Sequence, residues 1–250
     1  MKKVEPLIKP YVDKAEFPEF FRKEMQEVEY GKAWAPAKWG GFNYSALERH
    51  SLVWEISKVD VSLTTYCGVH ISLGTGSIEA CADEEQQKRF LPDCYSFNKI
   101  VAFGLTEPKY GSDATSMDTF AVKATDGRDG YILNGEKIWI GNGTFADYVV
   151  VWAKNREEKD KIQAFVVEKD FKGFSQSKIE GKYSLRMTQN AHLKFDNVFI
   201  PTRNKLTKAI DFEKSAGRVL LATRIGVAWF VSALAAGAYE TCLKYTLERK

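Results

Sequence analysis

The feature that most constrains the fold is a change in hydrophobic periodicity at Lys99. Between residue 16 and about residue 95, apolar residues recur at three- and four-residue spacing, as at Phe17, Phe20 and Phe21, which indicates amphipathic helices. After Lys99 the apolar residues form short runs rich in β-branched and aromatic side chains, which indicates strands. The expected strands cover residues 100–105, 120–124, 131–140, 148–153, 162–167 and 193–200.

No helical segment separates these runs, and turns containing Gly, Asp and Asn follow them closely. Parallel strands need long crossover connections, so this spacing predicts an antiparallel sheet that forms a barrel or a sandwich. Asn134-Gly135 lies between alternating apolar residues. This pair predicts a two-residue hairpin, because both central positions of a type I′ turn need positive φ.

Two local signals mark helix ends in the first part of the chain. The paired glycines in Trp39-Gly40-Gly41-Phe42 end one helix, and Ser45 can cap the next one. Residues 83–92 are acidic at their start and end in a proline. They predict a short solvated helix that Pro92 terminates.

The end of the chain is helical again. After Pro201, a polar linker to about residue 210 leads into an Ala-, Leu- and Gly-rich run that continues to Lys250. Its apolar stretch, Ile225 to Tyr239, is about fifteen residues long, short of the roughly 20 needed to cross a bilayer. We therefore expect no transmembrane segment but a helix buried on all sides, which requires partner helices.

Together these patterns predict an α+β protein with three parts. Residues 1–98 form an N-terminal helical domain, and residues 99–205 form a central antiparallel β-barrel or sandwich domain. Residues 206–250 start a C-terminal helical bundle that is incomplete in this chain.

Charge and cysteine content argue against several functional classes. The 36 Lys+Arg against 33 Asp+Glu give a net charge of +3, too balanced for a nucleic-acid-binding surface. The four cysteines form no C-x-x-C motif, so we expect neither a disulfide framework nor a metal site. The N-terminus carries Glu5, Asp13 and Glu16, unlike a signal or transit peptide. P-loop, dinucleotide-binding, zinc-protease and nucleophile-elbow motifs do not occur.

Two segments have the composition of a ligand site. Gly104-Leu105-Thr106-Glu107-Pro108-Lys109-Tyr110-Gly111-Ser112-Asp113 joins a predicted strand to a loop of small and hydroxylated residues. Gly111 and Ser112 would let a phosphate or a flat ring approach the backbone, although the segment could equally be a surface turn. Trp139-Ile140-Gly141-Asn142-Gly143 could form a wall for a planar cofactor, although most such tryptophans belong to the core.

Together the two segments resemble the acyl-CoA dehydrogenase and oxidase family, flavoproteins that desaturate acyl thioesters between Cα and Cβ. The resemblance runs from about residue 20 to residue 250 and includes three further motifs in matching order. These are Gly181-Lys182-Tyr183-Ser184-Leu185-Arg186, Phe195-Asp196-Asn197-Val198-Phe199-Ile200-Pro201 and Arg224-Ile225-Gly226-Val227-Ala228-Trp229. The chain is most similar to the glutaryl-CoA dehydrogenases and the short-chain peroxisomal acyl-CoA oxidases of plants.

The resemblance implies FAD as cofactor, with two walls of the chain on either side of its ring. Thr106 would hydrogen-bond the polar edge of the isoalloxazine, and Ser112 would face the diphosphate and the bound thioester. Arg224 matches an arginine near the bound CoA. The flavin-facing set implied in this way is Phe103, Leu105, Thr106, Gly111, Ser112, Trp139, Ile140 and Gly141. All of this requires that the turn bearing Ser112 and the indole of Trp139 converge on one slot.

Four departures from the family pattern stand out. Tyr110 replaces a small residue before Gly-Ser-Asp, and Gly141 replaces a threonine common in the dehydrogenases. Thr64 stands where glutaryl-CoA dehydrogenases carry the arginine that pairs with the substrate's distal carboxylate, which argues against glutaryl-CoA. Thr223 stands where a few members carry the base.

No catalytic base can therefore be named, and we expect it beyond Lys250, in a C-terminal helical domain. The implied activity is α,β-desaturation of an acyl-CoA, in fatty acid β-oxidation or amino acid catabolism. The chain could also be one half of a split enzyme or a non-catalytic structural subunit. The resemblance further implies a homo-oligomer or a complementary C-terminal chain as partner, and a mitochondrial or peroxisomal location.

Overall fold

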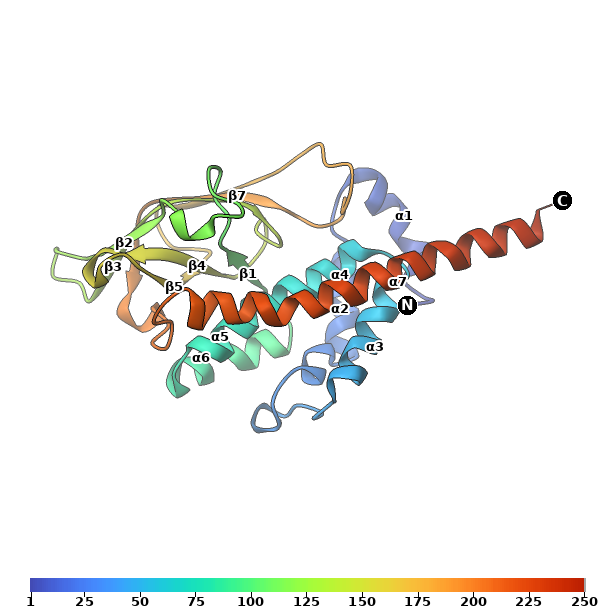
Figure 1. The fold of residues 1–250 in the computed structure, drawn as a ribbon, viewed down its shortest axis with the longest axis horizontal. Helices are drawn as coiled ribbons and strands as arrows, with labels where there is room; N and C mark the ends of the chain where they lie inside the picture. Colours follow the sequence, from blue (N-terminus) through green and yellow to red (C-terminus); the bar gives the residue numbers. More distant parts are fainter. Residues whose placement is uncertain (250) are drawn as a thin grey trace.

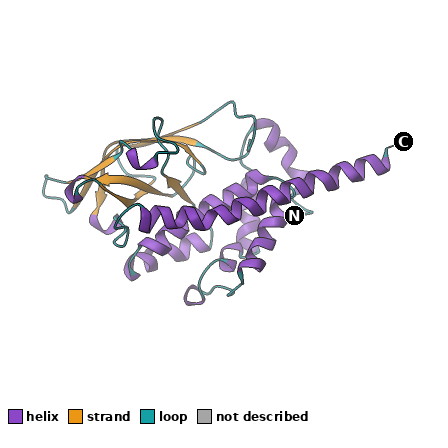
Figure 2. Cartoon of the chain, in the orientation of Figure 1, coloured by secondary structure: helices purple, strands orange, loops and turns teal. Residues whose placement is uncertain are grey.

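The change of periodicity at Lys99 coincides with the boundary between helices and sheet. In the computed structural model, which describes residues 1–249, the helices of the first part lie beside a curled sheet, and one long helix runs along both (Figures 1 and 2). The α+β arrangement is confirmed. The helices of the first part are α1 (Glu5–Lys14), α2 (Glu19–Glu27), α3 (Ala46–Ser57), α4 (Val61–Cys67), the π-helical turn η3 (Gly68–Thr75), α5 (Gly76–Cys81) and α6 (Glu84–Tyr95).

The central sheet has seven strands in the order β1-β4-β2-β3-β7-β6, with β5 paired to β4. The prediction of a purely antiparallel sheet is wrong, because β1 and β2 both pair with β4 in parallel. The crossover between β1 and β4 is made by β2 and β3 rather than by a helix, so the lack of intervening helices did not exclude parallel pairing. The strands are β1 (Val101–Gly104), β2 (Phe120–Lys123), β3 (Gly130–Ile140), β4 (Tyr148–Asn155), β5 (Lys161–Glu168), β6 (Phe174–Lys178) and β7 (Ala191–Pro201).

Strand β4 separates two hydrophobic cores. Successive side chains of a strand point to opposite faces, and here both faces are covered. Val150 and Trp152 join the core between sheet and helices, whereas Val149 and Val151 join the core inside the curled sheet. The strand thus holds the helical layer at a fixed position on the sheet.

The hairpin predicted at Asn134-Gly135 is wrong, because both residues lie inside β3. The β3–β7 register shifts there, so that Asn134 alone faces Asp196 and Asn197, and Asn134 Oδ1 accepts a hydrogen bond from the Asn197 N–H at 2.8 Å. Gly135 has φ +137° and lies so close to Thr119 that a Cβ would come 2.4 Å from its hydroxyl. The glycine therefore serves a close approach within the sheet rather than a turn.

The helix signals were partly right. Ser45 caps α3 in a capping box with Glu48, as its position indicated. Pro92 does not end its helix, since α6 continues to Tyr95. Pro92 removes only one backbone donor from the helix. At the N-terminal end of α6, Asp83 and Gln86 form a reciprocal cap that stabilises the helix.

The helices α4, η3 and α5 form one continuous helix that is fixed to β1 by a buried histidine. His70 Nδ1 accepts from the Val101 N–H at 3.0 Å, and His70 Nε2 donates to the Cys94 carbonyl at 2.9 Å. The helix face that carries Val69 and Leu73 is thereby held against the first strand of the sheet.

The last helix, α7 (Arg218–Glu248), lies across α3 and η3 and extends past the rest of the molecule (Figure 1). The expectation of a helix buried on all sides is wrong for the part of the chain described, because only Val219, Ala233 and Gly237 of α7 are buried. By length and composition, Glu213–Glu248 is long and apolar enough to cross a membrane. The expectation of no transmembrane segment counted only residues 225–239, whereas the helix extends well beyond them.

Candidate functional site

The two segments singled out in the sequence lie side by side, and three hydrogen bonds join the first one to the two residues before the second. Lys137 Nζ donates to the Leu105 carbonyl at 2.9 Å and to Glu107 Oε1 at 2.8 Å, and the Ile138 N–H donates to the Thr106 carbonyl at 2.9 Å. The stretch that follows β1 and the end of β3 therefore form two adjoining walls.

Between these walls lies a cavity of about 230 Å³, called the slot from here on. Six of the eight residues implied to face a flavin line it: Phe103, Leu105, Thr106, Trp139, Ile140 and Gly141. Val69, Leu73 and Leu220 complete the lining, and sequence reasoning missed all three. The only signal they carry is apolar character at helical spacing, which ordinary core residues share.

Gly111, Ser112 and Arg224 do not line this cavity. Gly111 and Ser112 are exposed on the loop after Glu107, and Arg224 is exposed near the start of α7. Thr106 and Trp139 line the same cavity, whereas the turn that bears Ser112, which was expected to converge on Trp139, does not line it.

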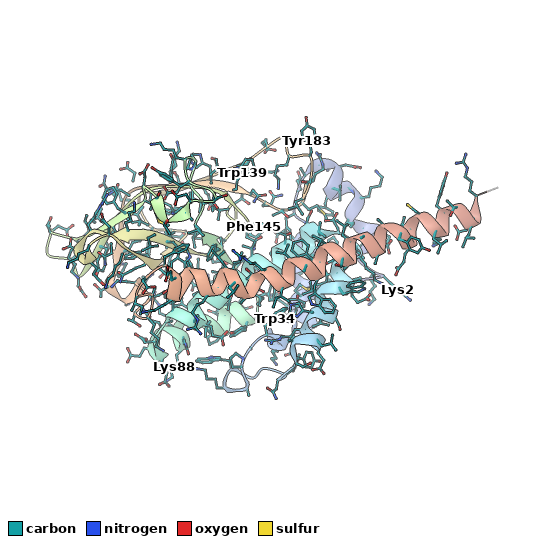
Figure 3. The ribbon with its side chains drawn as sticks, in the orientation of Figure 1. Lys2, Trp34, Lys88, Trp139, Phe145 and Tyr183 are labelled. Carbon is teal, nitrogen blue, oxygen red and sulfur yellow. The ribbon has the colours of Figure 1, made fainter. Side chains whose placement is uncertain are left out.

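Trp139 owes its position to a bulge. Between Lys137 and Ile140, two residues of β3 face only His192 of β7, and Trp139 takes a φ of +62° that bulky residues rarely adopt. Asn190 Nδ2 holds the Trp139 carbonyl at 3.0 Å. The indole is consequently 55% exposed, and it lies at the edge of the sheet facing away from α3 (Figure 3). Strained backbone of this kind clusters at ligand sites.

Gly141 is explained by its neighbour Val69. A Cβ on residue 141 would come 2.9 Å from Val69 Cγ2, closer than side chains pack. From the sequence, Gly141 was noted only as the replacement of a threonine common in the dehydrogenases, whereas the structure shows that Val69 occupies the space a side chain would need.

The charges beside the slot are buried and paired. Lys137 and Glu107 have side-chain exposures of 0% and 3%. Burial lowers the pKa of Lys137 to about 8, opposed by the charge and hydrogen bond of Glu107. Burial pushes the pKa of Glu107 upward, but the charge of Lys137 and hydrogen bonds from Lys137, Thr119 and Asp118 outweigh it, so the net shift is downward. Both groups are therefore ionised at neutral pH.

A larger cavity of about 570 Å³ adjoins the slot and shares Val69 and Leu73 with it. Helices α3, α4, η3, α5 and α7 surround this cavity, and its lining is mostly apolar. Thr64 and Thr223, noted in the sequence as departures, both line it. Sequence reasoning missed its charged lining residues, Arg49 and Glu79.

Each of these two charged residues contacts an aromatic residue rather than the other. Glu79 Oε2 accepts a hydrogen bond from the Tyr95 hydroxyl at 2.7 Å, and the Arg49 guanidinium lies over the Trp34 ring at 5.5 Å. Neither makes an ion pair within residues 1–249.

The residues of the slot fit a flat ring with one polar edge. Most of its lining side chains are apolar, and Thr106 is the one lining residue that carries a hydroxyl. An exposed tryptophan beside apolar side chains and a single hydroxyl are features that bind and orient planar ligands.

Comparison with known proteins shows which protein family has this architecture. Residues 1–98 match the acyl-CoA dehydrogenase N-terminal domain, and residues 102–198 match the acyl-CoA dehydrogenase middle domain. The short-chain specific acyl-CoA dehydrogenase of Clostridium acetobutylicum is 34% identical over 94% of this chain and 64% of its own length. Isobutyryl-CoA dehydrogenase of Dictyostelium discoideum is 32% identical over 94% of this chain and 56% of its own length.

Solved structures of this family have the same fold as this chain. Butyryl-CoA dehydrogenase from Megasphaera elsdenii superposes with a TM-score of 0.92 at 31% identity, over 100% of this chain and 66% of that one. A glutaryl-CoA dehydrogenase from Mycobacterium smegmatis in complex with FADH2 superposes with a TM-score of 0.90 at 30% identity, over 98% and 62%. The chain thus spans less than two thirds of the curated relatives it matches. It belongs to the acyl-CoA dehydrogenase family, of which it contains the N-terminal and middle domains.

Proposed function

We propose that this chain binds FAD and an acyl-CoA thioester and forms part of an enzyme that desaturates the acyl group between Cα and Cβ. The observation that carries the proposal is the pair of adjoining cavities that share Val69 and Leu73. A ring in the smaller cavity and an acyl chain in the larger one would meet at these two side chains.

In this proposal the walls of the slot bind the cofactor, which accepts a hydride from Cβ when bound. The Thr106 hydroxyl orients the polar edge of the ring, and Trp139, Ile140 and Gly141 cover its other side. Gly111 and Ser112 lie on an exposed loop, where the diphosphate and the thioester can reach them. Arg224 is exposed beside the larger cavity and is available to the CoA.

The proton at Cα needs a carboxylate base. Thr223 cannot supply one, and Glu79, the only acidic residue lining either cavity, is engaged by Tyr95. We therefore place the base outside residues 1–249. The exposed apolar residues of α7 favour a protein segment that packs there and could carry it, either a complementary chain or a further part of the same protein. These residues are Leu221, Ile225, Val227, Val231, Leu234, Tyr239, Leu243, Tyr245 and Leu247.

A non-catalytic structural subunit is the alternative, because the same apolar residues fit a protein whose role is to bind a partner. FAD binding separates the two candidates. The purified chain is titrated with FAD, and binding is followed by flavin fluorescence and visible absorption, with Thr106→Val as the matched variant that removes only the hydroxyl. Butyryl-CoA is then added, with free CoA as control.

We expect saturable FAD binding that Thr106→Val weakens, and a change in the flavin spectrum with butyryl-CoA but not with CoA. Failure to bind either ligand would contradict the proposal for this chain and favour the structural subunit. Curated relatives include both bacterial and mitochondrial enzymes, and a mitochondrial or peroxisomal location stays a prediction for this chain.

A further inference from the structure

The ion pair between Lys137 and Glu107 lies at the junction of the two walls of the slot. A role in holding these walls would explain its position. The pair joins residues 30 positions apart in the chain. Lys137 directly precedes Ile138 and Trp139 on one wall, and Glu107 directly follows Thr106 on the other. No other described ion pair has both side chains this deeply buried.

Stability alone does not account for such a pair. Removing two charges from water is costly, and replacing a buried pair with apolar residues of similar volume is often neutral or stabilising. An ion pair that adds little stability can still select one geometry, because each buried charged group needs hydrogen-bond partners at specific positions.

One of those atoms, the Leu105 carbonyl, belongs to a residue that lines the slot. Lys137 Nζ is satisfied by the Leu105 carbonyl, by Glu107 Oε1 and, at 3.7 Å, by Met117 Sδ. Its bond to Leu105 lies beside the Ile138–Thr106 backbone bond. Removing the ammonium leaves that single backbone bond to hold the two walls together.

Glu107 also closes the loop that carries Gly111 and Ser112. Its Oε2 accepts from the Asp118 N–H at 2.6 Å, and its Oε1 accepts from the Thr119 N–H at 3.0 Å. One carboxylate therefore anchors both ends of residues 107–119.

We propose that Lys137 and Glu107 are positioning residues that hold the Leu105–Thr106 wall, the Trp139–Gly141 wall and the Ser112 loop in the geometry that binds the flavin. The inference rests on the proposed function for the identity of the ligand. This clamp, meaning the Lys137–Glu107 ion pair with its hydrogen bonds to the walls and the loop, is a property of this chain. Its effect on the walls can be measured without ligand.

The test compares Lys137→Met with the double variant Lys137→Met/Glu107→Gln. The single variant leaves a buried carboxylate unpaired, so its urea midpoint should fall strongly. In the double variant no buried charge is left, and the single amide oxygen of the glutamine can still accept from one of the two N–H groups of Asp118 and Thr119. Its urea midpoint should therefore lie above that of the single variant and recover part of the loss.

The decisive readouts are FAD affinity and amide exchange in the double variant. With the unpaired buried charge removed, we expect FAD binding to remain about 10- to 100-fold weaker than in the wild type, because the walls are no longer held. We also expect the Ile138 amide, which bonds Thr106, to exchange faster without ligand. Lys205→Met, at the Lys205–Glu158 pair remote from the slot, is the control and should change neither readout.

The possible results are distinct. If the double variant binds FAD like the wild type, or its Ile138 amide exchanges at the wild-type rate, the clamp is refuted. If the wild type binds no FAD, the proposed function fails, while the Ile138 exchange rate still decides whether the pair holds the walls.

Discussion

At the scale of single residues, the contact between Gly141 and Val69 sets the width of the slot. A Cβ at position 141 would lie 2.9 Å from Val69 Cγ2, and valine has little rotamer freedom with which to move away. We expect Gly141→Thr to lower the free energy of unfolding by about 1–3 kcal/mol through overpacking, and Val69→Ala in the same chain to restore part of it. Urea unfolding of the four chains measures both effects.

The control for this cycle is Gly111→Ala, since a Cβ at Gly111 meets nothing within 4 Å. It should leave the urea midpoint unchanged. A Gly141→Thr protein as stable as the wild type would show that Val69 does not restrict this position.

The buried His70 links stability to pH in the acid range. Burial lowers its pKa to about 3, and its two ring nitrogens already bond Cys94 and Val101 as a neutral ring. Because the unfolded chain binds this proton near pH 6.5 and the folded one does not, the neutral ring favours folding fully above pH 6.5. That contribution is lost at about 1.4 kcal/mol per pH unit as pH falls from 6.5 toward 3.

We expect His70→Gln to be less stable at neutral pH but to lose less stability on acidification than the wild type. Urea midpoints between pH 7 and about pH 4 measure this slope. His50→Gln, on the partly exposed face of α3, is the control for loss of a histidine. Parallel pH profiles of wild type and His70→Gln would contradict the assignment.

At the scale of elements, alternating hydrophobicity predicted most strands because it is a local pattern. Strand β6 was missed since Phe174–Lys178 is polar and mostly exposed, and only pairing with β7 makes it a strand. The parallel pairing of β1 with β4 depends on contacts between distant segments, which periodicity does not encode. The same limit applies to the site: Thr106 and Trp139 belong to recognisable segments, whereas Val69 and Leu73 look like any buried helix face.

The contact between α3 and α7 depends on a second glycine. A Cβ on Gly237 would come 2.2 Å from the Lys58 carbonyl, which belongs to the backbone and cannot move without shifting α3. We expect Gly237→Ala to cost about 1–3 kcal/mol of unfolding free energy. Gly226→Ala is the matched control in the same helix, because its nearest atom, His50 Nε2, lies 4.0 Å away.

The control substitution should gain up to about 1 kcal/mol from helix propensity. Thermal unfolding followed by circular dichroism compares the two variants. If both shift the unfolding temperature in the same direction, the close approach of α7 to Lys58 is not what holds the helices together.

At the scale of the whole molecule, the division into helices, sheet and helix could be predicted because hydrophobic periodicity changes at each boundary. The surroundings of α7 could not. An apolar helix predicts burial, but burial depends on neighbours, and within residues 1–249 these lie along one side of the helix only. Large exposed apolar patches on soluble proteins mark interaction surfaces.

We therefore expect the chain to self-associate through α7 when no other protein covers this helix, and charges placed there to prevent association. Ile225 and Leu247 are 61% and 77% exposed, so Ile225→Glu/Leu247→Glu should leave the fold intact while the sedimentation coefficient falls to that of a monomer. Thr125→Glu/Ser184→Glu adds the same charge on exposed loops and should still associate. A wild-type chain that sediments as a monomer at every concentration would show that these apolar residues tolerate water, and the argument for a partner on α7 would fail with it.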